Sequence, residues 1–372
     1  MKFDAERALT LTQRFDFPRH AGTEGERRAA DLVAEEFERA GLSVERRAVP
    51  PRRLPDALIF GTLAMWFGFV IGRVFAGWSP AVGFGAAVLV LGSLIATGWV
   101  RRRSDRAAPG RSENVLGTRP GEAEAPVRVL FLAPLDTPPP VRVVLARRGV
   151  LALFAALAAV LVAPGLTDET GLRRVAGPIV LLGHWVSVVS WIVAPRVRAR
   201  GPSPGDHRSG LAALAELARG WTRGAGARIE TRFGALGDSA RHQAGARALA
   251  RDMAHWPAKP TLVIHLDAPG LGPTLRLVGR ARTLSLAQEA ARDLWIPHRA
   301  SSWIGRSLGH EPFRGRETWG VSLCGERRVA RIDPAALAAA AQLATEIALR
   351  WARQRRAADQ DESRARSSQK PG

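Results

Sequence analysis

Four long apolar runs constrain the fold of this chain more than any other feature of its sequence. They cover Ala57–Gly72, Pro80–Val100, Gly149–Leu166 and Val175–Pro195. The second and the fourth are each 21 residues long, close to the ~20 residues that a helix needs to cross a bilayer. A buried globular helix accounts for one such run, but not for four in paired spacing. We therefore predict two transmembrane helical hairpins, with four spans in all.

Arginine residues flank the outer ends of both predicted hairpins. Four arginines lie just before the first span and four lie just after the second, whereas the connector between these two spans holds only Arg73. Because arginine and lysine concentrate on the cytoplasmic side of membrane proteins, we predict a multi-pass integral membrane protein whose soluble segments all face the cytoplasm. The single cysteine, Cys324, fits a reducing compartment. The charged segment 1–45 predicts a folded start without a cleavable signal peptide.

The formal net charge of +20 raises the question of a nucleic-acid partner. The basic residues are nearly all arginine and gather beside the predicted spans, and no recognised nucleic-acid motif accompanies them. Membrane topology and attraction to anionic lipid headgroups account for the same charge. The sequence therefore argues against nucleic acid and predicts the lipid bilayer as a partner.

Helices and strands alternate once the four apolar runs are set aside. Thr23-Glu24-Gly25-Glu26 is typical of a capped helix start, and apolar residues follow at helical spacing as far as Gly41. The pattern predicts strands over 42–49, 114–117, 127–132, 228–235, 261–266, 274–278 and 319–323, and further helices over 209–221, 240–254, 284–294 and 334–355. We therefore predict an α/β three-layer sandwich with a central, largely parallel sheet, interrupted by the two transmembrane hairpins.

The predicted hairpins divide one soluble domain into three parts. The domain would begin with 1–56, continue over 101–148 and end with 196–355, with hairpins at 57–100 and 149–195. Residues 356–372 are charged and rich in serine, without an apolar period, and predict a disordered tail.

The strand end Leu132-Ala133-Pro134-Leu135-Asp136-Thr137 carries the strongest functional signal. It follows an apolar strand and leaves it at the edge where α/β enzymes place their chemistry. It resembles the His-x-Asp-Ser/Thr strand end of the co-catalytic zinc exopeptidases, the aminopeptidase and glutaminyl-cyclase family. The resemblance implies that a histidine binds one zinc ion and that the aspartate two residues later orients it. Here Asp136 and Thr137 remain, but Pro134 stands at the histidine position.

Other segments resemble the same family in the same order, over most of the chain from about Arg19 to Arg350. Arg19–Gly25 is similar to the family's arginine-glycine-threonine segment, and Ser112–Gly117 is similar to its asparagine-valine strand. Pro204–Leu211 is similar to its Gly-Ala-Asp-Asp-Asn-Ala-Ser-Gly-Val segment. Ile264–Asp267 is similar to its Asn-x-Asp strand end, and Gly309–Phe313 is similar to its Ser-Asp-His-x-x-Phe element.

The resemblance implies two zinc ions about 3.5 Å apart, bridged by a carboxylate, with an adjacent glutamate as general base. At the matching positions the bridging aspartate falls at Gly205, with Asp206 beside it. No glutamate occurs between Glu230 and Glu289, so Asp238 is the substitute left for the general base. A second zinc-binding histidine is implied after His310, where the sequence has none.

Five residues remain as candidates for a site. Asp206, Asp267 and His310 are the candidate metal ligands, and Asp136 and Asp238 are the candidate catalytic residues. No cofactor is expected; zinc or another divalent metal is implied if the chain is active, and this carboxylate-rich set suits magnesium or calcium better than zinc. Structural roles stay open for the same residues: Asp206 and Asp267 as caps of a helix and a turn, and His310 as a hydrogen-bonding residue beside Phe313.

We therefore predict a membrane-anchored, zinc-exopeptidase-like protein that is catalytically inactive. It would act as a binding or scaffolding module for a peptide or protein partner at the inner membrane face. Two alternatives stay open. One is an active metal-dependent aminopeptidase or peptide hydrolase with a rearranged site. The other is a subunit of a larger membrane complex.

Overall fold

The computed structural model describes residues 3–50, 112–119, 124–137, 207–221, 228–239, 243–302, 308–313, 317–326 and 331–368. They belong to one compact unit formed by three segments of the chain, Met1–Pro51, Pro109–Pro138 and Gly201–Gly372. The four apolar runs lie outside the described residues. Among the helices that are described, none is both long and apolar enough to span a bilayer. The two transmembrane hairpins therefore stay a prediction.

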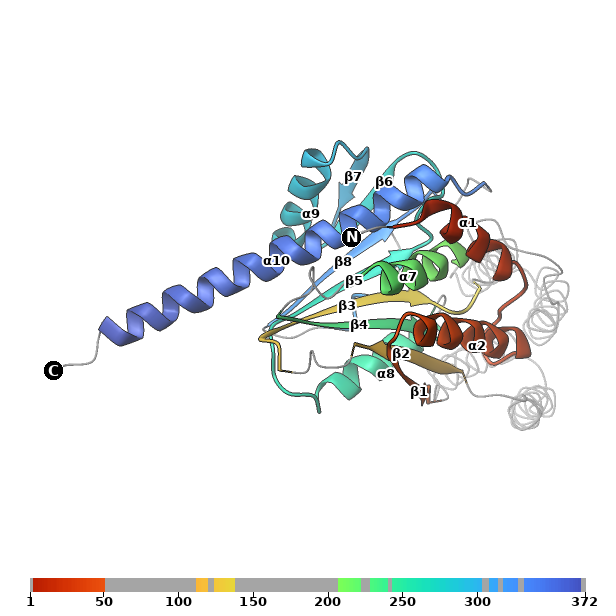
Figure 1. The fold of residues 1–372 in the computed structure, drawn as a ribbon, viewed down its shortest axis with the longest axis horizontal. Helices are drawn as coiled ribbons and strands as arrows, with labels where there is room; N and C mark the ends of the chain where they lie inside the picture. The colour runs from red at the N-terminus through yellow and green to blue at the C-terminus, as the bar shows by residue number, and fades with distance from the viewer. Residues whose placement is uncertain are drawn as a thin grey trace, which may run out of the picture. The chain divides into compact units, whose positions relative to one another are not determined.

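A mixed eight-stranded sheet lies at the centre of the described residues (Figure 1). Its strands are β1 (Ser43–Ala48), β2 (Glu113–Thr118), β3 (Val127–Pro134), β4 (Ile229–Leu236), β5 (Thr261–Asp267), β6 (Leu275–Gly279), β7 (His298–Ser301) and β8 (Thr318–Cys324). They follow the spatial order β1-β2-β4-β3-β5-β8-β6-β7. The inner strands β4, β3, β5 and β8 are parallel, whereas β2 and β6 run antiparallel to their inner neighbours. The predicted α/β class is confirmed, with parallel pairing concentrated in the middle of the sheet.

Helices cover both faces of this sheet. They are α1 (Ala5–Arg14), α2 (Glu24–Arg39), α7 (Arg208–Gly220), α8 (Ala244–Met253), α9 (Ala281–Asp293) and α10 (Pro334–Ser368). Apolar residues of α1, α2, α7, α9 and α10 join one large core on one face. Apolar residues of α8 form a smaller core with the opposite face. The described part of the chain is therefore a three-layer sandwich.

Strand β3 is buried along its whole length because both of its faces are covered. Phe131 points into the larger core, where its ring lies 5.4 Å from that of Phe233 and 5.2 Å from that of Trp221. Leu130 and Leu132 point into the core beneath α8. This central position brings the end of β3 to the carboxyl edge of the sheet, beside the ends of β4 and β5.

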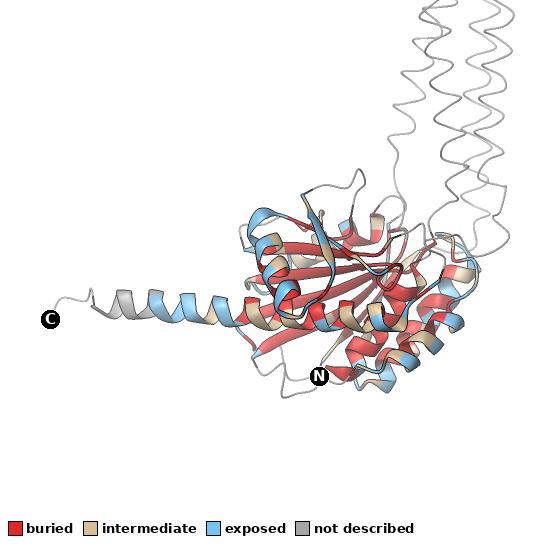
Figure 2. Ribbon diagram, turned by 90° about the horizontal axis from the view of Figure 1, so that it is seen from above, coloured by how far each residue is buried: buried red, intermediate tan, exposed pale blue. Residues whose placement is uncertain are grey.

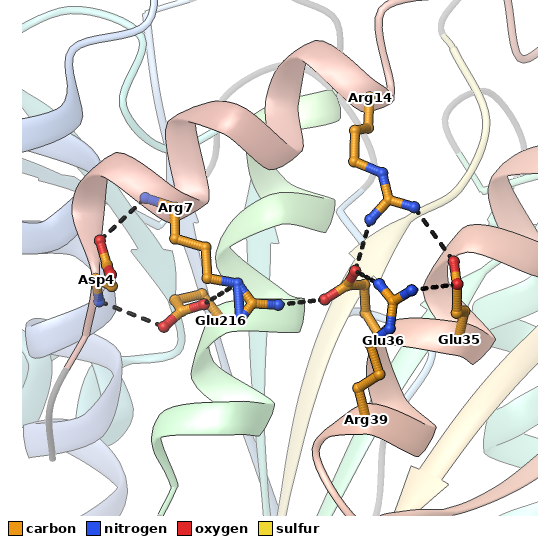
Figure 3. A network of polar contacts seen from close by, with 7 residues as sticks. All are labelled: Asp4, Arg7, Arg14, Glu35, Glu36, Arg39 and Glu216. Carbon is orange, nitrogen blue, oxygen red and sulfur yellow. Dashed lines mark hydrogen bonds and ion pairs between the residues drawn. The ribbon is translucent and has the colours of Figure 1, made fainter.

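An ion-pair network ties α1, α2 and α7 together (Figure 3). The buried carboxylate of Glu36 accepts hydrogen bonds from Arg7, from Arg14 at 2.7 Å and from Arg39 at 2.8 Å. Arg7 also lies 3.5 Å from Glu216 on α7. Burial raises the pKa of Glu216, although Arg7 counteracts it. The network therefore fixes the N-terminal helix on the two helices beneath it.

The last helix is longer than its apolar spacing predicts. We expected an end near Arg355 and a disordered tail over 356–372, but α10 continues to Ser368, and its residues 357–361 are exposed (Figure 2). The extension includes three arginines and three alanines, residue types that favour helix without any apolar face. Arg356 Nε also donates to the carbonyl of Ala352 at 3.2 Å. The disordered tail is therefore wrong for residues 356–368, and residues 369–372 lie outside the described ranges.

A buried ion pair joins β3 to β4 near their amino ends. Arg128 and Glu230 each have side chains 2% exposed and form two hydrogen bonds, of 2.9 and 3.0 Å. Lys259 and Arg232 donate to the same carboxylate, each at 2.8 Å. Burial alone would raise the pKa of Glu230, but the hydrogen bonds from Arg128 and Lys259 outweigh it and hold that pKa below its ordinary value.

We expect Glu230→Gln to lower the free energy of unfolding by about 3–5 kcal/mol at pH 7, because Arg128 loses its charged partner inside the protein. The folded-state pKa of Glu230 lies below its unfolded-state value. This carboxylate therefore stabilises the fold above the unfolded-state pKa, and that stabilisation is lost as pH falls through the folded-state pKa. Urea unfolding of the full chain at pH 7 and at pH 3 measures both effects. The exposed control Glu289→Gln should change stability by less than ~0.5 kcal/mol, and equal stability of the two variants would contradict the prediction.

Candidate active site

The carboxyl edge of the central strands collects three of the predicted site residues. Asp136 follows β3, Asp238 follows β4 and Asp267 ends β5. This is the edge at which α/β folds bind their ligands. Asp206 lies outside the described residues. The topology therefore places Asp136, Asp238 and Asp267 where the sequence predicted a site.

Asp267 contacts a histidine that the sequence did not single out. His207 Nδ1 lies 2.9 Å from Asp267 Oδ1, and both side chains are buried. His207 immediately precedes α7, whose first turn approaches β5 closely at Gly210. A Cβ at Gly210 would lie 2.6 Å from the carbonyl oxygen of Leu266. Glycine therefore permits the close packing that brings the imidazole to the carboxylate.

Asp136 and Glu26 hold the turn between β4 and α8. Asp136 Oδ1 accepts a hydrogen bond from the N–H of Ser239 at 2.7 Å. Glu26 Oε1 accepts one from the N–H of Asp238 at 2.9 Å. Asp238 has a φ of 43°, a left-handed conformation that is uncommon outside glycine. The two carboxylates therefore serve as acceptors that stabilise a strained turn.

Glu26 belongs to the capping box that the sequence predicted, but its carboxylate does not bind the N–H of the N-cap residue itself. Thr23 is the N-cap and its side chain accepts the N–H of Glu26, as predicted. The Glu26 carboxylate reaches one residue further back, to the N–H of Gly22 at 2.6 Å, and also accepts from Ser112 Oγ at 2.7 Å. Burial raises the pKa of Glu26 in spite of these bonds. One buried side chain thus connects α2, β2 and the turn after β4.

His310 lies in a buried pair of histidines. Its Nδ1 is 2.6 Å from Ser322 Oγ, and His265 Nδ1 is 3.1 Å from the same oxygen. The register of β5 against β8 places His265 opposite Ser322. Burial lowers the pKa of His310 to about 3, with further lowering from His265 and Arg280. His310 is therefore a neutral imidazole at physiological pH, hydrogen-bonded inside the domain.

The donor set at this edge does not fit a di-zinc centre. Pro134 offers no imidazole, and no glutamate follows β4, where Gly237 and Asp238 stand. The carboxylates of Asp136 and Asp267 bind Ser239 and His207. Within the described ranges, no three histidine, cysteine, aspartate or glutamate side chains lie together as a metal site would require.

Solved structures share this arrangement of helices and strands. A Zn-dependent exopeptidase from Parabacteroides distasonis aligns with a TM-score of 0.51 and 15% identity, covering 93% of this chain and 98% of that one. A glutaminyl cyclase from Fimbriiglobus ruber aligns at 0.52 and 12%, covering 94% and 96%. The LapA aminopeptidase of Legionella pneumophila aligns at 0.50 and 11%, covering 94% and 72%.

The chain has the zinc-exopeptidase fold. This confirms the resemblance that the sequence motifs indicated. At these identities the likeness concerns the fold and not the activity. No protein-family model and no curated protein sequence matches the chain.

Sequence reasoning missed His207, His265 and Ser322. His265 carries one usable signal, because it precedes Asp267 by two positions in a strand, and such residues share a face. Its contact with Ser322 depends on the pairing of β5 with β8, which are 50 residues apart in the chain. The contact of His207 with Asp267 depends on how α7 packs against β5. Neither pairing leaves a local pattern.

We expect acid to destabilise the domain between pH 6.5 and about 3 because of His310. The unfolded chain binds a proton near the ordinary pKa of 6.5, whereas the folded chain binds it near 3. The stabilisation is complete above the unfolded-state pKa and is lost as pH falls through the folded-state pKa. His310→Gln keeps a donor and an acceptor but cannot take up charge. Its free energy of unfolding should therefore decrease less on acidification than that of wild type, by several kcal/mol at most.

Urea unfolding at a series of pH values measures this effect. His298→Gln, which replaces a half-buried histidine on β7, is the matched control and should leave the pH dependence unchanged. An identical acid response of wild type and His310→Gln would contradict the prediction.

Proposed function

We propose that this protein is a non-catalytic exopeptidase-like module, anchored in a bilayer by two hairpins, that binds a peptide or protein partner at the inner membrane face. The proposal that the protein is non-catalytic rests on one observation, which is that the remaining carboxylates at this edge contact other groups of the protein. Asp267 binds His207 and Asp136 binds the N–H of Ser239. Asp267, the candidate metal ligand, and Asp136, the candidate catalytic residue, therefore both have a structural role.

Weak metal binding follows from the absence of residues that the family uses to bind zinc. Removing one residue that merely orients a metal ligand typically lowers affinity or activity 10–100-fold. Here the first histidine position is Pro134, and the glutamate pair after β4 is absent. Losses of this kind multiply, so the remaining acidic residues would hold zinc weakly.

The proposed membrane anchor rests on the four apolar runs and their arginine flanks. The second predicted hairpin lies between Thr137 and His207 in the sequence. Both residues belong to the carboxyl edge, because Thr137 follows β3 and His207 binds Asp267. The chain thus leaves and re-enters the described unit beside the candidate site.

A second candidate function is supported by the His207–Asp267 pair. A carboxylate that binds one nitrogen of an imidazole is the arrangement by which proteins orient a histidine for metal binding or proton transfer. Together with Asp206, Asp238 and His310, this pair would form the rearranged site of an active metal-dependent peptide hydrolase. Metal content separates this alternative from the leading proposal.

We expect the full-length protein, purified in detergent, to contain far less than one divalent metal ion per chain. Mass spectrometry of wild type, of Asp267→Ala and of the exposed control Glu289→Ala gives the comparison. The leading proposal predicts the same low metal content in all three and no turnover of aminoacyl or peptide substrates. Near-stoichiometric metal in wild type and in Glu289→Ala that disappears in Asp267→Ala would instead favour the hydrolase.

We expect the chain to stay in the membrane pellet after alkaline extraction, with the connector at Arg73 outside the cell and the domain inside. Cysteine accessibility tests the orientation, since the one native cysteine, Cys324, is buried. In intact cells an impermeant thiol reagent should label Arg73→Cys but not Glu289→Cys, which requires permeabilised cells. Release of the chain by alkali would contradict the anchor, and the reverse labelling pattern would contradict the orientation.

A further inference from the structure

Trp295 is exposed to solvent in a backbone conformation that is unfavourable for tryptophan. Its side chain is 92% exposed, and no other large hydrophobic residue is exposed within the described part of the chain. Its φ is 56°, in the left-handed region that favours glycine. Tryptophan is therefore disfavoured here twice, once by its contact with water and once by its backbone.

The conformation comes from the way that α9 ends. The N–H of Ile296 donates to the carbonyl of Ala291, and the N–H of Trp295 donates to that of Arg292. These two bonds form the Schellman motif, in which the left-handed position usually holds glycine. Ile296 is buried and anchors the turn in the core. The turn thus gains its packing from Ile296, while the ring of Trp295 points away from the core.

Two exposed arginines lie close to Trp295 along the chain. Arg292 and Arg299 lie within four residues of Trp295, and both are exposed. The nearest acidic residue, Asp293, is already paired with Arg350 at 2.6 Å. Arg299 lies on β7, the outermost strand of the sheet among the described residues. We call Arg292, Trp295 and Arg299 the Trp295 surface.

We infer that the Trp295 surface contacts the headgroup layer of an anionic bilayer, with the indole ring inserted at the interface. Tryptophan favours this layer because one part of its ring system is apolar and its N–H is polar. Exposed arginines such as Arg292 and Arg299, three and four residues from it in the sequence, attract anionic lipid phosphates. The inference rests on the proposed membrane anchor, which would hold the domain near the bilayer and raise the effective concentration of such a contact.

A bilayer fits this surface better than a protein partner does. A stable protein interface usually buries at least about 1,000 Å² and has several apolar residues at its centre. The Trp295 surface offers one aromatic residue between two arginines, and the other large apolar side chains of the described residues are not exposed. A single aromatic anchor with flanking positive charge is sufficient for a weak contact that tethering strengthens.

The test uses the full-length protein in nanodiscs and an environment-sensitive fluorophore on Trp295→Cys. Wild type, whose Cys324 is buried, controls for labelling at the native position. We expect a blue-shifted emission that lipid-borne quenchers reduce in nanodiscs of phosphatidylcholine and phosphatidylglycerol, and a smaller effect in phosphatidylcholine alone. Arg251→Cys, on the exposed side of α8 across the sheet, should show neither change. Adding Arg292→Glu and Arg299→Glu to Trp295→Cys should abolish the quenching.

Two outcomes would overturn the inference while leaving the anchor intact. One is a chain that enters nanodiscs with the fluorophore at residue 295 still fully exposed. The other is a blue-shifted emission that lipid-borne quenchers do not reduce, which would indicate a protein contact. A chain that fails to enter nanodiscs would contradict the proposed anchor itself, and the inference with it.

Thermal unfolding of Trp295→Gly gives an independent measurement. Glycine fits the left-handed position, so the variant should unfold a few degrees higher than wild type if the ring makes no structural contact. A lower unfolding temperature would assign Trp295 a packing role and overturn the inference.

Discussion

The described structure depends on the burial of β3 on both faces. Phe131 packs into the core beneath five helices, and Leu130 and Leu132 pack into the core beneath α8. β3 lies between β4 and β5 in the middle of the sheet, where helices cover both faces, as is typical of parallel strands. Their carboxyl ends then meet at one edge. Asp136, Asp238 and Asp267 therefore lie at this edge, whereas His310 lies in the segment before β8.

Acidic residues at that edge have partners inside the protein. His207 binds Asp267, the N–H of Ser239 binds Asp136, and the N–H of Asp238 binds Glu26. A buried carboxylate without a partner would be costly, so a fold that has lost metal ligands needs other donors for the acids that remain. The backbone of the turn after β4 and the histidine before α7 supply them.

Membrane attachment and the domain surface would act together in such a module. The predicted hairpins interrupt the chain between β1 and β2 and between β3 and α7, without adding a strand to the described sheet. An aromatic residue at the end of α9, disfavoured there by its backbone and by water, makes sense if part of its environment is lipid. The proposed anchor and the proposed contact of the Trp295 surface would both act on the same bilayer.

The sequence by itself determined the α/β class, most of the strands and the exopeptidase resemblance, because these depend on local apolar periods and short motifs such as the one ending at Asp136 and Thr137. It predicted the N-cap at Thr23 from the same kind of local pattern. It missed the helix α1, although that helix is amphipathic, and the short strand β7, and it ended α10 too early. Only the tertiary structure paired His207 with Asp267 and His265 with Ser322 and His310. Such contacts join residues that strand order and helix packing bring together across long stretches of chain, and no local pattern encodes that order.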